Sequence, residues 1–247
     1  MEAEVVSVGS RFEAEFDEWA ATYDQTVASG SDVFQGYEDV LDAVAAEVMA
    51  SDGAAVVDLG AGTGNLSARL VRRNLCVMAV EPSAAMRHAL RRKLPEVEVL
   101  ARACQHLPDG LPPLEAIAST FAFHHVSPAM RRRSLRRLAE ALLPHGRLVI
   151  ADIAFAGPLL RRRIFGELAR QDRHDLLGNL RVEFYPTVDV LLAAMHDVGL
   201  RATARQLTPW VWLFRAERGP LDLGLSARVP RPIHGLRTQG EAESLAD

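Results

Sequence analysis

Hydrophobic and polar positions along the chain fall into two alternating patterns. Short apolar runs bounded by glycine, proline or charged residues predict buried strands, and apolar residues repeating at helical spacing predict amphipathic helices between them. This alternation favours an α/β fold in which helices cover a parallel sheet. The predicted strands are residues 56–59, 76–80, 97–100, 115–120, 147–152, 201–207 and 211–216, and the predicted helices are residues 10–25, 35–50, 65–73, 84–93, 128–143 and 188–198.

The C-terminal part of the chain departs from simple alternation. Residues 154–183 have a helical pattern and are expected to form an insertion on the side of the sheet where such segments shape binding pockets. The connection around Thr208 and Pro209 is so short that the two strands beside it must pair antiparallel. Residues 218–247 are rich in proline, glycine and charge and predict a flexible tail. We therefore expect one domain over residues 1–217.

A glycine-rich turn links the first strand to the helix after it. Gly60, Gly62 and Gly64 lack a side chain, which lets the backbone turn sharply and approach a ligand. A dinucleotide fingerprint would place its third glycine one residue later, at Asn65, so a nicotinamide cofactor is disfavoured. Glu81 ends the second strand, where an acidic residue can bind a ribose diol. Such turns also occur without a ligand, but Glu81 favours an adenosine ligand.

Several segments resemble a known family. DLGAGTGN (58–65) and VEPS (80–83) are similar to motifs I and II of the class I S-adenosylmethionine-dependent methyltransferases. FDEWAATYDQTV (16–27), STFAFHHV (119–126) and WVWLFRAE (210–217) resemble the small bacterial methyltransferases of the YrrT type. The resemblance implies a Rossmann-like, doubly wound, seven-stranded, mostly parallel sheet with an antiparallel C-terminal hairpin. It also implies a helical cap at residues 1–52 and methyl transfer from S-adenosylmethionine, which leaves as S-adenosylhomocysteine.

The resemblance further implies a cofactor site. The glycine turn would hold the methionyl part, Glu81 the ribose, and Trp19 with Tyr23 would close over the sulfonium, because cations are attracted to aromatic faces. The family usually has an acidic residue at the adenine amino group, but this sequence has Ala103 there. The expected cofactor-binding residues are Trp19, Tyr23, Gly60, Ala61, Gly62, Thr63, Gly64, Glu81, Pro82, Ser83, Met86, Ala103, Cys104, Gln105, Thr120 and Phe121.

Two adjacent histidines follow the fourth strand, at the edge where open α/β sheets bind ligands. Neighbouring side chains point in different directions, so we expect only His124 to face the methyl acceptor and His125 to be hydrogen-bonded within the fold. Tyr23 and Tyr185 are the other candidates for orienting or deprotonating the acceptor. Methyl transfer is an in-line displacement, for which alignment of the reactants contributes more than a general base.

Composition narrows the possible partners. The net charge of −4 and the isoelectric point near 6.1 give no general attraction to nucleic acid or anionic membranes. The arginines of 128–143 are interpreted as a solvated face, because no aromatic residues lie between them to stack on bases. Those of 161–163 are also interpreted as a solvated face, although they could attract an acidic acceptor. Cys76 is expected in a buried strand and Cys104 in a loop, at a spacing that predicts neither a disulfide nor a metal site.

The N-terminal residues lack the pattern of a signal peptide, and no apolar run is long enough to span a bilayer. We therefore expect a cytoplasmic enzyme, monomeric or homodimeric, that binds no metal and methylates an oxygen, nitrogen or sulfur atom of a small molecule. Two alternatives stay open: an RNA methyltransferase that uses the arginine faces, and a non-catalytic S-adenosylmethionine-binding protein, which Ala103 suggests.

Overall fold

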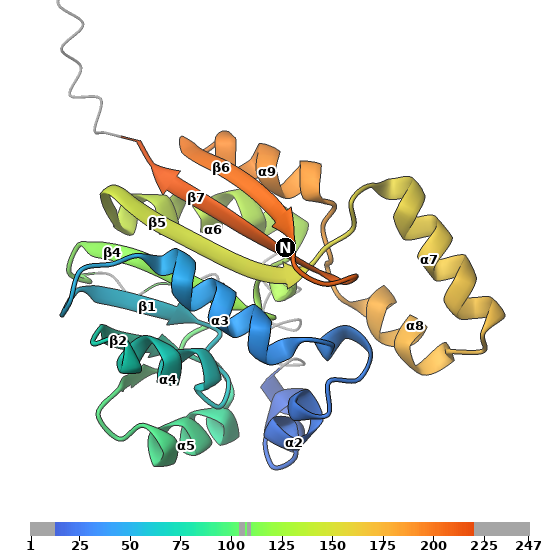
Figure 1. Cartoon of the computed structure of the whole chain (residues 1–247), viewed down its shortest axis with the longest axis horizontal. Helices are drawn as coiled ribbons and strands as arrows, with labels where there is room; N and C mark the ends of the chain where they lie inside the picture. Colours follow the sequence, from blue (N-terminus) through green and yellow to red (C-terminus); the bar gives the residue numbers. More distant parts are fainter. Residues whose placement is uncertain (1–12, 104–106, 108–109, 220–247) are drawn as a thin grey trace, which may run out of the picture.

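The computed structural model describes residues 13–103, 107 and 110–219. Its centre is a seven-stranded sheet in the order β3-β2-β1-β4-β5-β7-β6, with helices on both faces (Figure 1). The strands from β3 to β5 run parallel, whereas β7 pairs antiparallel with β5 and β6. The doubly wound sheet with an antiparallel C-terminal hairpin is therefore confirmed. The strands are β1 (Ala55–Leu59), β2 (Cys76–Val80), β3 (Glu98–Leu100), β4 (Leu114–Thr120), β5 (Leu142–Ile153), β6 (Leu200–Gln206) and β7 (Val211–Arg218).

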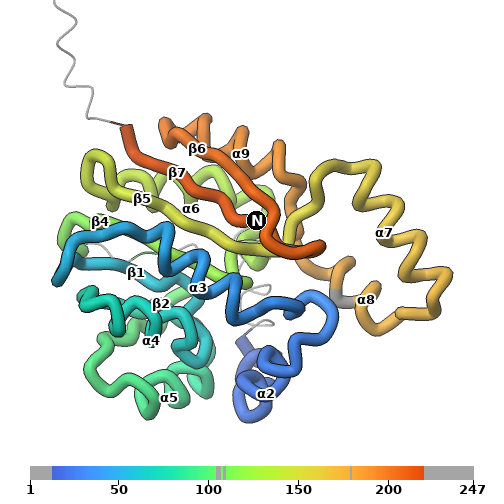
Figure 2. Tube along the Cα trace, in the orientation of Figure 1, coloured from blue at the N-terminus to red at the C-terminus, as the bar shows by residue number. Residues whose placement is uncertain are grey.

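Helices form a layer on each face of the sheet. The buried side chains of α3 (Tyr37–Val48), α4 (Asn65–Arg72) and α5 (Ala84–Lys93) join one core cluster, and those of α6 (Pro128–Ala141) and α9 (Val188–His196) join the other. α7 (Pro158–Arg170) and α8 (His174–Val182) pack on each other in the segment expected to form the insertion, at one end of the sheet (Figure 2). The short helices are residues 13–19, α2 (Tyr23–Ala28), η1 (Asp32–Phe34) and η2 (Phe123–His125).

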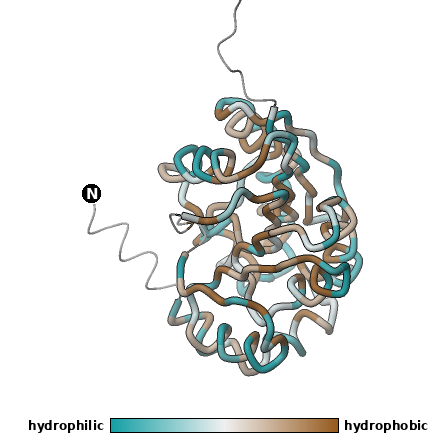
Figure 3. Tube along the Cα trace, turned by 90° about the vertical axis from the view of Figure 1, so that its left-hand side faces the viewer, coloured by the Kyte–Doolittle hydropathy of each residue, from teal (hydrophilic) through white to brown (hydrophobic). Residues whose placement is uncertain are grey.

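Alternation along each strand builds the two cores. Val56 of β1 packs in the cluster with α3 and α4, whereas its neighbour Val57 packs in the cluster with α6 and α9. In β4, Ala116 likewise packs in the cluster with α3 and α4, and its neighbour Ile117 packs in the cluster with α6 and α9. Hydrophobic colours accordingly run through the interior of the molecule (Figure 3). Because both faces of the parallel strands are covered, these strands appear in the sequence as nearly continuous apolar runs.

Three local predictions were wrong. The helix predicted over 10–25 is interrupted in the described part of the chain, because residues 20–22 form a turn between two short helices. β5 begins at Leu142 rather than at 147, and its register against β4 shifts between Leu114 and Ala116. Cys76 is exposed rather than buried, since it is the first residue of β2 and its side chain alternates with that of buried Val77.

Some predictions lie outside the described residues: the tail from residue 220 onward, the first part of the cap, Cys104 and Gln105. Within the described residues, none of the helices combines the length and the apolar character required to cross a bilayer.

The glycine turn between β1 and α4 has the backbone conformation that its sequence predicted. Gly60, Gly62 and Gly64 have φ angles of 73°, 55° and 87°, which only glycine adopts without strain. Gly64 is also tightly packed, because a Cβ atom there would lie 2.8 Å from Cγ of Leu90 in α5. The turn therefore depends on glycine both for its backbone angles and for its contact with α5.

We expect Gly64→Ala to lower the free energy of unfolding by about 1–3 kcal/mol more than Gly53→Ala, measured by urea denaturation without ligand. Gly53 is a matched control, because its φ of 75° is also left-handed but a Cβ there meets no atom within 4 Å. The difference between the variants thus reports the packing against Leu90. Equal losses of stability would show that the contact with α5 contributes nothing.

Candidate active site

The parallel register brings four chemically distinct segments to one edge of the sheet. The glycine turn follows β1, Glu81 follows β2, and the histidines of η2 follow β4, while Asp152 lies one residue before the end of β5. Strands that run in the same direction end at the same edge, so segments distant in the sequence meet there. This edge is the usual ligand-binding position of an open α/β sheet.

Glu81 joins two of these segments. Its side chain is 5% exposed; Oε2 accepts a hydrogen bond from N of Gly62 at 2.9 Å, and Oε1 accepts one from N of Ser83 at 2.8 Å. Burial raises the pKa of Glu81 to about 7, although these hydrogen bonds by themselves would lower it. A carboxylate has about four acceptor positions, so each oxygen can accept a further hydrogen bond, such as one from a ribose hydroxyl.

A second carboxylate, Asp58, is buried near the end of β1. Its Oδ2 accepts a hydrogen bond from Oγ of Ser67 at 2.6 Å, and its Oδ1 has no hydrogen-bond partner among the described residues. Burial raises the pKa of Asp58 to about 6. Both Asp58 and Glu81 thus carry acceptor capacity that the described residues leave partly unused, and both fit a ligand that offers hydroxyl or ammonium donors.

The N-terminal segment is attached to both loops by carboxylates. Asp17 Oδ1 accepts hydrogen bonds from Oγ of Ser83 at 2.6 Å and from N of Ala85 at 3.0 Å. Asp24 Oδ1 accepts one from Oγ1 of Thr63 at 2.5 Å, and Asp24 Oδ2 pairs with Nζ of Lys93 at 3.0 Å. These contacts hold residues 13–28 against the glycine turn and the start of α5. From here on, the cap means these residues, which are part of the helical cap expected over residues 1–52.

Aromatic rings continue from the cap to the end of β4. The ring centroids are 4.9 Å apart for Trp19 and Tyr23, 6.0 Å for Trp19 and Phe34, and 5.5 Å for Phe34 and Phe121. Tyr37 stacks on Phe121 at 5.4 Å and accepts a hydrogen bond from Nδ2 of Asn65. Burial, followed by the influence of Tyr37, raises the pKa of Tyr23 well above its ordinary value, so Tyr23 keeps its proton at neutral pH. This row can present ring faces to a cation.

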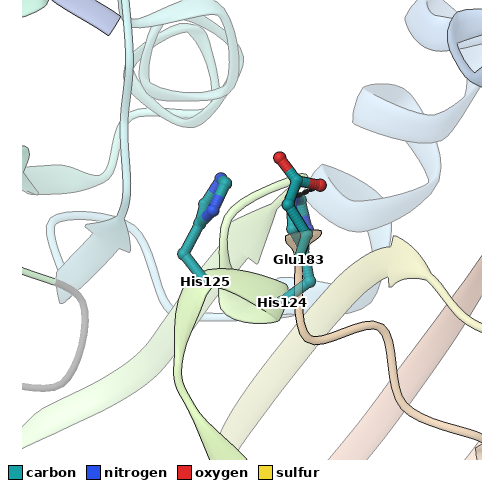
Figure 4. Close-up of side chains that lie close together, drawn as sticks. All are labelled: His124, His125 and Glu183. Atoms are coloured by element: carbon teal, nitrogen blue, oxygen red, sulfur yellow. Dashed lines mark ion pairs between the residues drawn. The ribbon is translucent and has the colours of Figure 1, made fainter. Parts of the chain in front are cut away.

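His124 lies in a buried polar cluster. Its Nδ1 lies 2.6 Å from Oδ1 of Asp152, and its backbone N donates to Oδ2 of the same residue at 2.9 Å. Its Nε2 lies 3.3 Å from Oε2 of Glu183, and Figure 4 shows these two side chains together with His125. The hydroxyl of Tyr185 donates to Glu183. Burial by itself would lower the pKa of His124, but the two carboxylates outweigh it and raise the pKa to about 10. His124 is therefore an imidazolium at neutral pH.

His125 has a different environment. Its ring centroid lies 4.1 Å from that of His124 and 5.2 Å from that of Phe16, which meets it edge to face. Burial, followed by the charge of His124, lowers the pKa of His125 well below its ordinary value, so its ring is neutral. The two histidines thus differ in charge although they are adjacent in the sequence.

The structure brings together most of the residues that the sequence singled out. Pro82, Ser83 and Met86 lie at the start of α5, where Ser83 caps the helix by accepting a hydrogen bond from N of Met86. Thr120 ends β4, and Ala103 is half-buried. Tyr185 lies beside His124, with ring centroids 4.6 Å apart. Tyr23 instead lies among the aromatic residues of the cap.

Sequence reasoning missed four carboxylates of this region: Asp17, Asp24, Asp152 and Glu183. Asp17 and Asp24 lie in the segment 16–27 that carries part of the family resemblance, which could have indicated them. Asp152 ends a strand predicted to reach the ligand edge, which is a weaker signal. Nothing in the sequence pairs Glu183 with His124, because the pairing depends on how the chain returns from α8 toward η2.

Comparison with known proteins agrees with this geometry. Residues 56–146 match the model of a family described as a methyltransferase domain. The chain is 35% identical over 214 residues to an uncharacterized methyltransferase of Geobacillus kaustophilus, covering 85% of this chain and 98% of the relative. It is 33% identical over 217 residues to the uncharacterized methyltransferase YrrT of Bacillus subtilis, covering 85% of this chain and 99% of that one.

A solved structure has the same fold at low sequence identity. It is the magnesium protoporphyrin IX methyltransferase of Synechocystis with bound S-adenosylmethionine, which is 15% identical and superposes with a TM-score of 0.61 over 86% of this chain and 97% of that one. At this identity the likeness shows a shared fold.

The attachment of the cap gives a testable prediction. Asp24→Ala removes the acceptor of Thr63 and Lys93, so we expect amide hydrogen exchange in residues 13–28 to accelerate about fivefold or more. Mass spectrometry of peptic fragments would measure it. Glu15→Ala is the matched control, because Glu15 is an exposed acidic residue of the same segment. If the two variants exchange alike, Asp24 does not anchor the cap.

Proposed function

The chain belongs to the family of S-adenosylmethionine-dependent methyltransferases that includes YrrT, and we propose that it methylates an oxygen, nitrogen or sulfur atom of a small molecule. The buried cluster of His124, Asp152, Glu183 and Tyr185 carries the small-molecule assignment. His124 is 5% exposed, and Phe16 of the cap packs on the adjacent His125. Phe16 thus covers one side of the cluster, and a buried cluster of this kind suits a small molecule better than a folded macromolecule.

We assign the cofactor to the glycine turn, Glu81 and the cap. The backbone of Gly60–Gly64 would hold the methionyl part, Glu81 would accept hydrogen bonds from the ribose, and Trp19 with Tyr23 would cover the sulfonium. Ala103 would lie at the adenine. The residues fit this ligand, because the two buried carboxylates of this edge retain acceptor positions and the aromatic row offers faces to a cation.

The chain's part in the reaction is mainly to align the acceptor. When bound, S-adenosylmethionine supplies a methyl group on a positively charged sulfur that is already a good leaving group. Orientation can supply about 7–11 kcal/mol, whereas a general base supplies a factor of about 10²–10⁴. His124 and Tyr23 both keep their protons at neutral pH. We therefore assign His124, Tyr23 and Tyr185 to orientation of the acceptor rather than to its deprotonation.

The alternative of an RNA substrate loses support from the positions of the arginines. Nη2 of Arg131, a buried residue of α6, donates to the backbone oxygen of Phe184 at 2.7 Å. Arg161 of α7 lies over the ring of Phe165, 5.3 Å from its centroid. Arg173 pairs with Asp32 at 2.8 Å. Arginines from both basic runs thus have structural contacts, although exposed arginines of α6 and α7 remain.

The acceptor class can be tested with the release of S-adenosylhomocysteine as the readout. We expect the purified protein to release it with S-adenosylmethionine and a mixture of small metabolites, but not with total RNA. His124→Gln should lower this rate about tenfold or more with unchanged S-adenosylmethionine affinity, because glutamine lacks the imidazolium charge. His88→Gln, a change at an exposed histidine of α5, is the control. Turnover with RNA alone would favour the RNA alternative. If no acceptor gives turnover, the result would favour a non-catalytic binding protein.

The role of Glu81 predicts a pH dependence of cofactor binding. Ribose hydroxyls donate to the ionised carboxylate, and the pKa of Glu81 is about 7, so affinity should fall as the pH drops below 7, by up to about tenfold per pH unit. Calorimetry between pH 5.5 and about 8.5 would measure it. Glu81→Gln should bind S-adenosylmethionine about tenfold or more weakly and lose most of this pH dependence. A small part of the dependence should remain, because Asp58 still titrates. An unchanged pH profile in Glu81→Gln would contradict the assignment.

A further inference from the structure

The polar cluster behind the cap contains more ligand atoms than acceptor orientation requires. His124, His125 and Glu183 each offer one metal-ligating atom, and these atoms all lie within 4.8 Å of one another. The two histidines rise from adjacent positions of η2, and Glu183 reaches the same space from the segment after α8 (Figure 4). We propose that these three side chains form a binding site for a divalent transition-metal ion.

The spacing of the atoms supports this proposal. A tetrahedral ion with bonds of about 2.0–2.1 Å holds its ligand atoms about 3.3 Å apart. Nε2 of His124 and Oε2 of Glu183 already have a separation of 3.3 Å. The nitrogen of His125 lies within 4.8 Å of the other two atoms, so a shift of about 1.5 Å or less brings it to the distance that a third ligand requires.

An outer layer of hydrogen bonds fixes the orientation of two of the ligands. Asp152 accepts from both Nδ1 and the backbone N of His124, which directs Nε2 of that ring toward Glu183. The hydroxyl of Tyr185 donates to the Glu183 carboxylate. Metal-binding histidines commonly donate their other ring nitrogen to a carboxylate in this way, which orients the ring and raises its basicity. His124 therefore has the hydrogen-bond partner of a metal ligand as well as a suitable distance from Glu183.

The ligand types indicate which ions would bind. Two imidazoles and one carboxylate suit Zn²⁺, Co²⁺, Ni²⁺ or Fe²⁺, whereas Mg²⁺ and Ca²⁺ prefer a shell of oxygen atoms. The sequence predicted no metal site, because its reasoning rested on cysteine spacing and did not bring Glu183 to the histidines.

Three protein ligands leave at least one coordination position open. The cluster lies at the ligand edge of the sheet, beside the end of β4 and beneath Phe16 of the cap. An oxygen, nitrogen or sulfur atom of the acceptor could occupy the open position, where the ion would hold it and favour its deprotonated form. This last step rests on the proposed function, whereas binding of the ion does not.

Cobalt binding tests the site directly. The full-length protein, stripped with a chelator and dialysed, would be titrated with Co²⁺ while its visible ligand-field absorption is recorded. We expect saturation at one ion per chain and displacement by Zn²⁺. Glu183→Gln and His125→Gln should each weaken Co²⁺ binding about tenfold or more, and Asp152→Asn, which changes only the outer layer, should weaken it by about 10–100-fold.

The matched control is His174→Gln. His174 Nε2 also lies close to a carboxylate, 2.8 Å from Oδ1 of Asp172, but both side chains are largely exposed. This variant should bind Co²⁺ as the unaltered protein does. Calorimetry of S-adenosylmethionine binding checks that each variant is folded. Glu183→Gln and His125→Gln change different segments, so the test remains valid if one of these variants misfolds.

The proposal is overturned if the unaltered protein shows no ligand-field absorption, or if well-folded Glu183→Gln and His125→Gln bind Co²⁺ as tightly as His174→Gln. Because the readout is the spectrum of the ion, it does not depend on methyl transfer. A failure of metal binding leaves the proposed methyl transfer intact, and a failure to find an acceptor leaves the metal site intact.

Discussion

The buried carboxylate of Glu81 is the contact on which the ligand edge of this protein depends. It accepts one backbone hydrogen bond from the glycine turn after β1 and another from the first residues after β2, so a single side chain fixes two loops. Burying a carboxylate without a paired cation is unfavourable, and its pKa of about 7 reflects that penalty. A ligand that donates hydrogen bonds to Glu81 relieves the penalty, so the same residue that organises the loops also favours binding.

The cap relies on the same two loops. Asp24 reaches the glycine turn through Thr63, and Asp17 reaches the start of α5 through Ser83. These contacts are polar and partly exposed, so each contributes modestly compared with the apolar cores on either side of the sheet. Val27 of the cap adds apolar packing, because it is buried in the cluster with α3 and α4.

The polar cluster beneath the cap shows how a buried site satisfies its own charges. Asp152 and Glu183 are compensated in part by the protonated ring of His124, and Arg131 lies near enough to Asp152 to interact with it electrostatically. Without such pairing, buried carboxylates would be strongly destabilising. The proposed metal ion would place further positive charge among the same side chains. The cluster is therefore suited both to orienting an acceptor and to holding a cation.

The sequence alone determined the sheet, the helices on both of its faces, the glycine turn and the position of Glu81 at a strand end. These features depend on hydrophobic periodicity and on local backbone preference, both of which can be read along the chain. The tertiary structure decided the break near residue 20 and the exposure of Cys76. It also decided the attachment of Asp24 to Lys93 and the meeting of Glu183 with His124. Such pairings join segments that are distant in the sequence, so they form only when the chain folds. The charges of the buried groups depend on burial, so they too are set only in the folded protein.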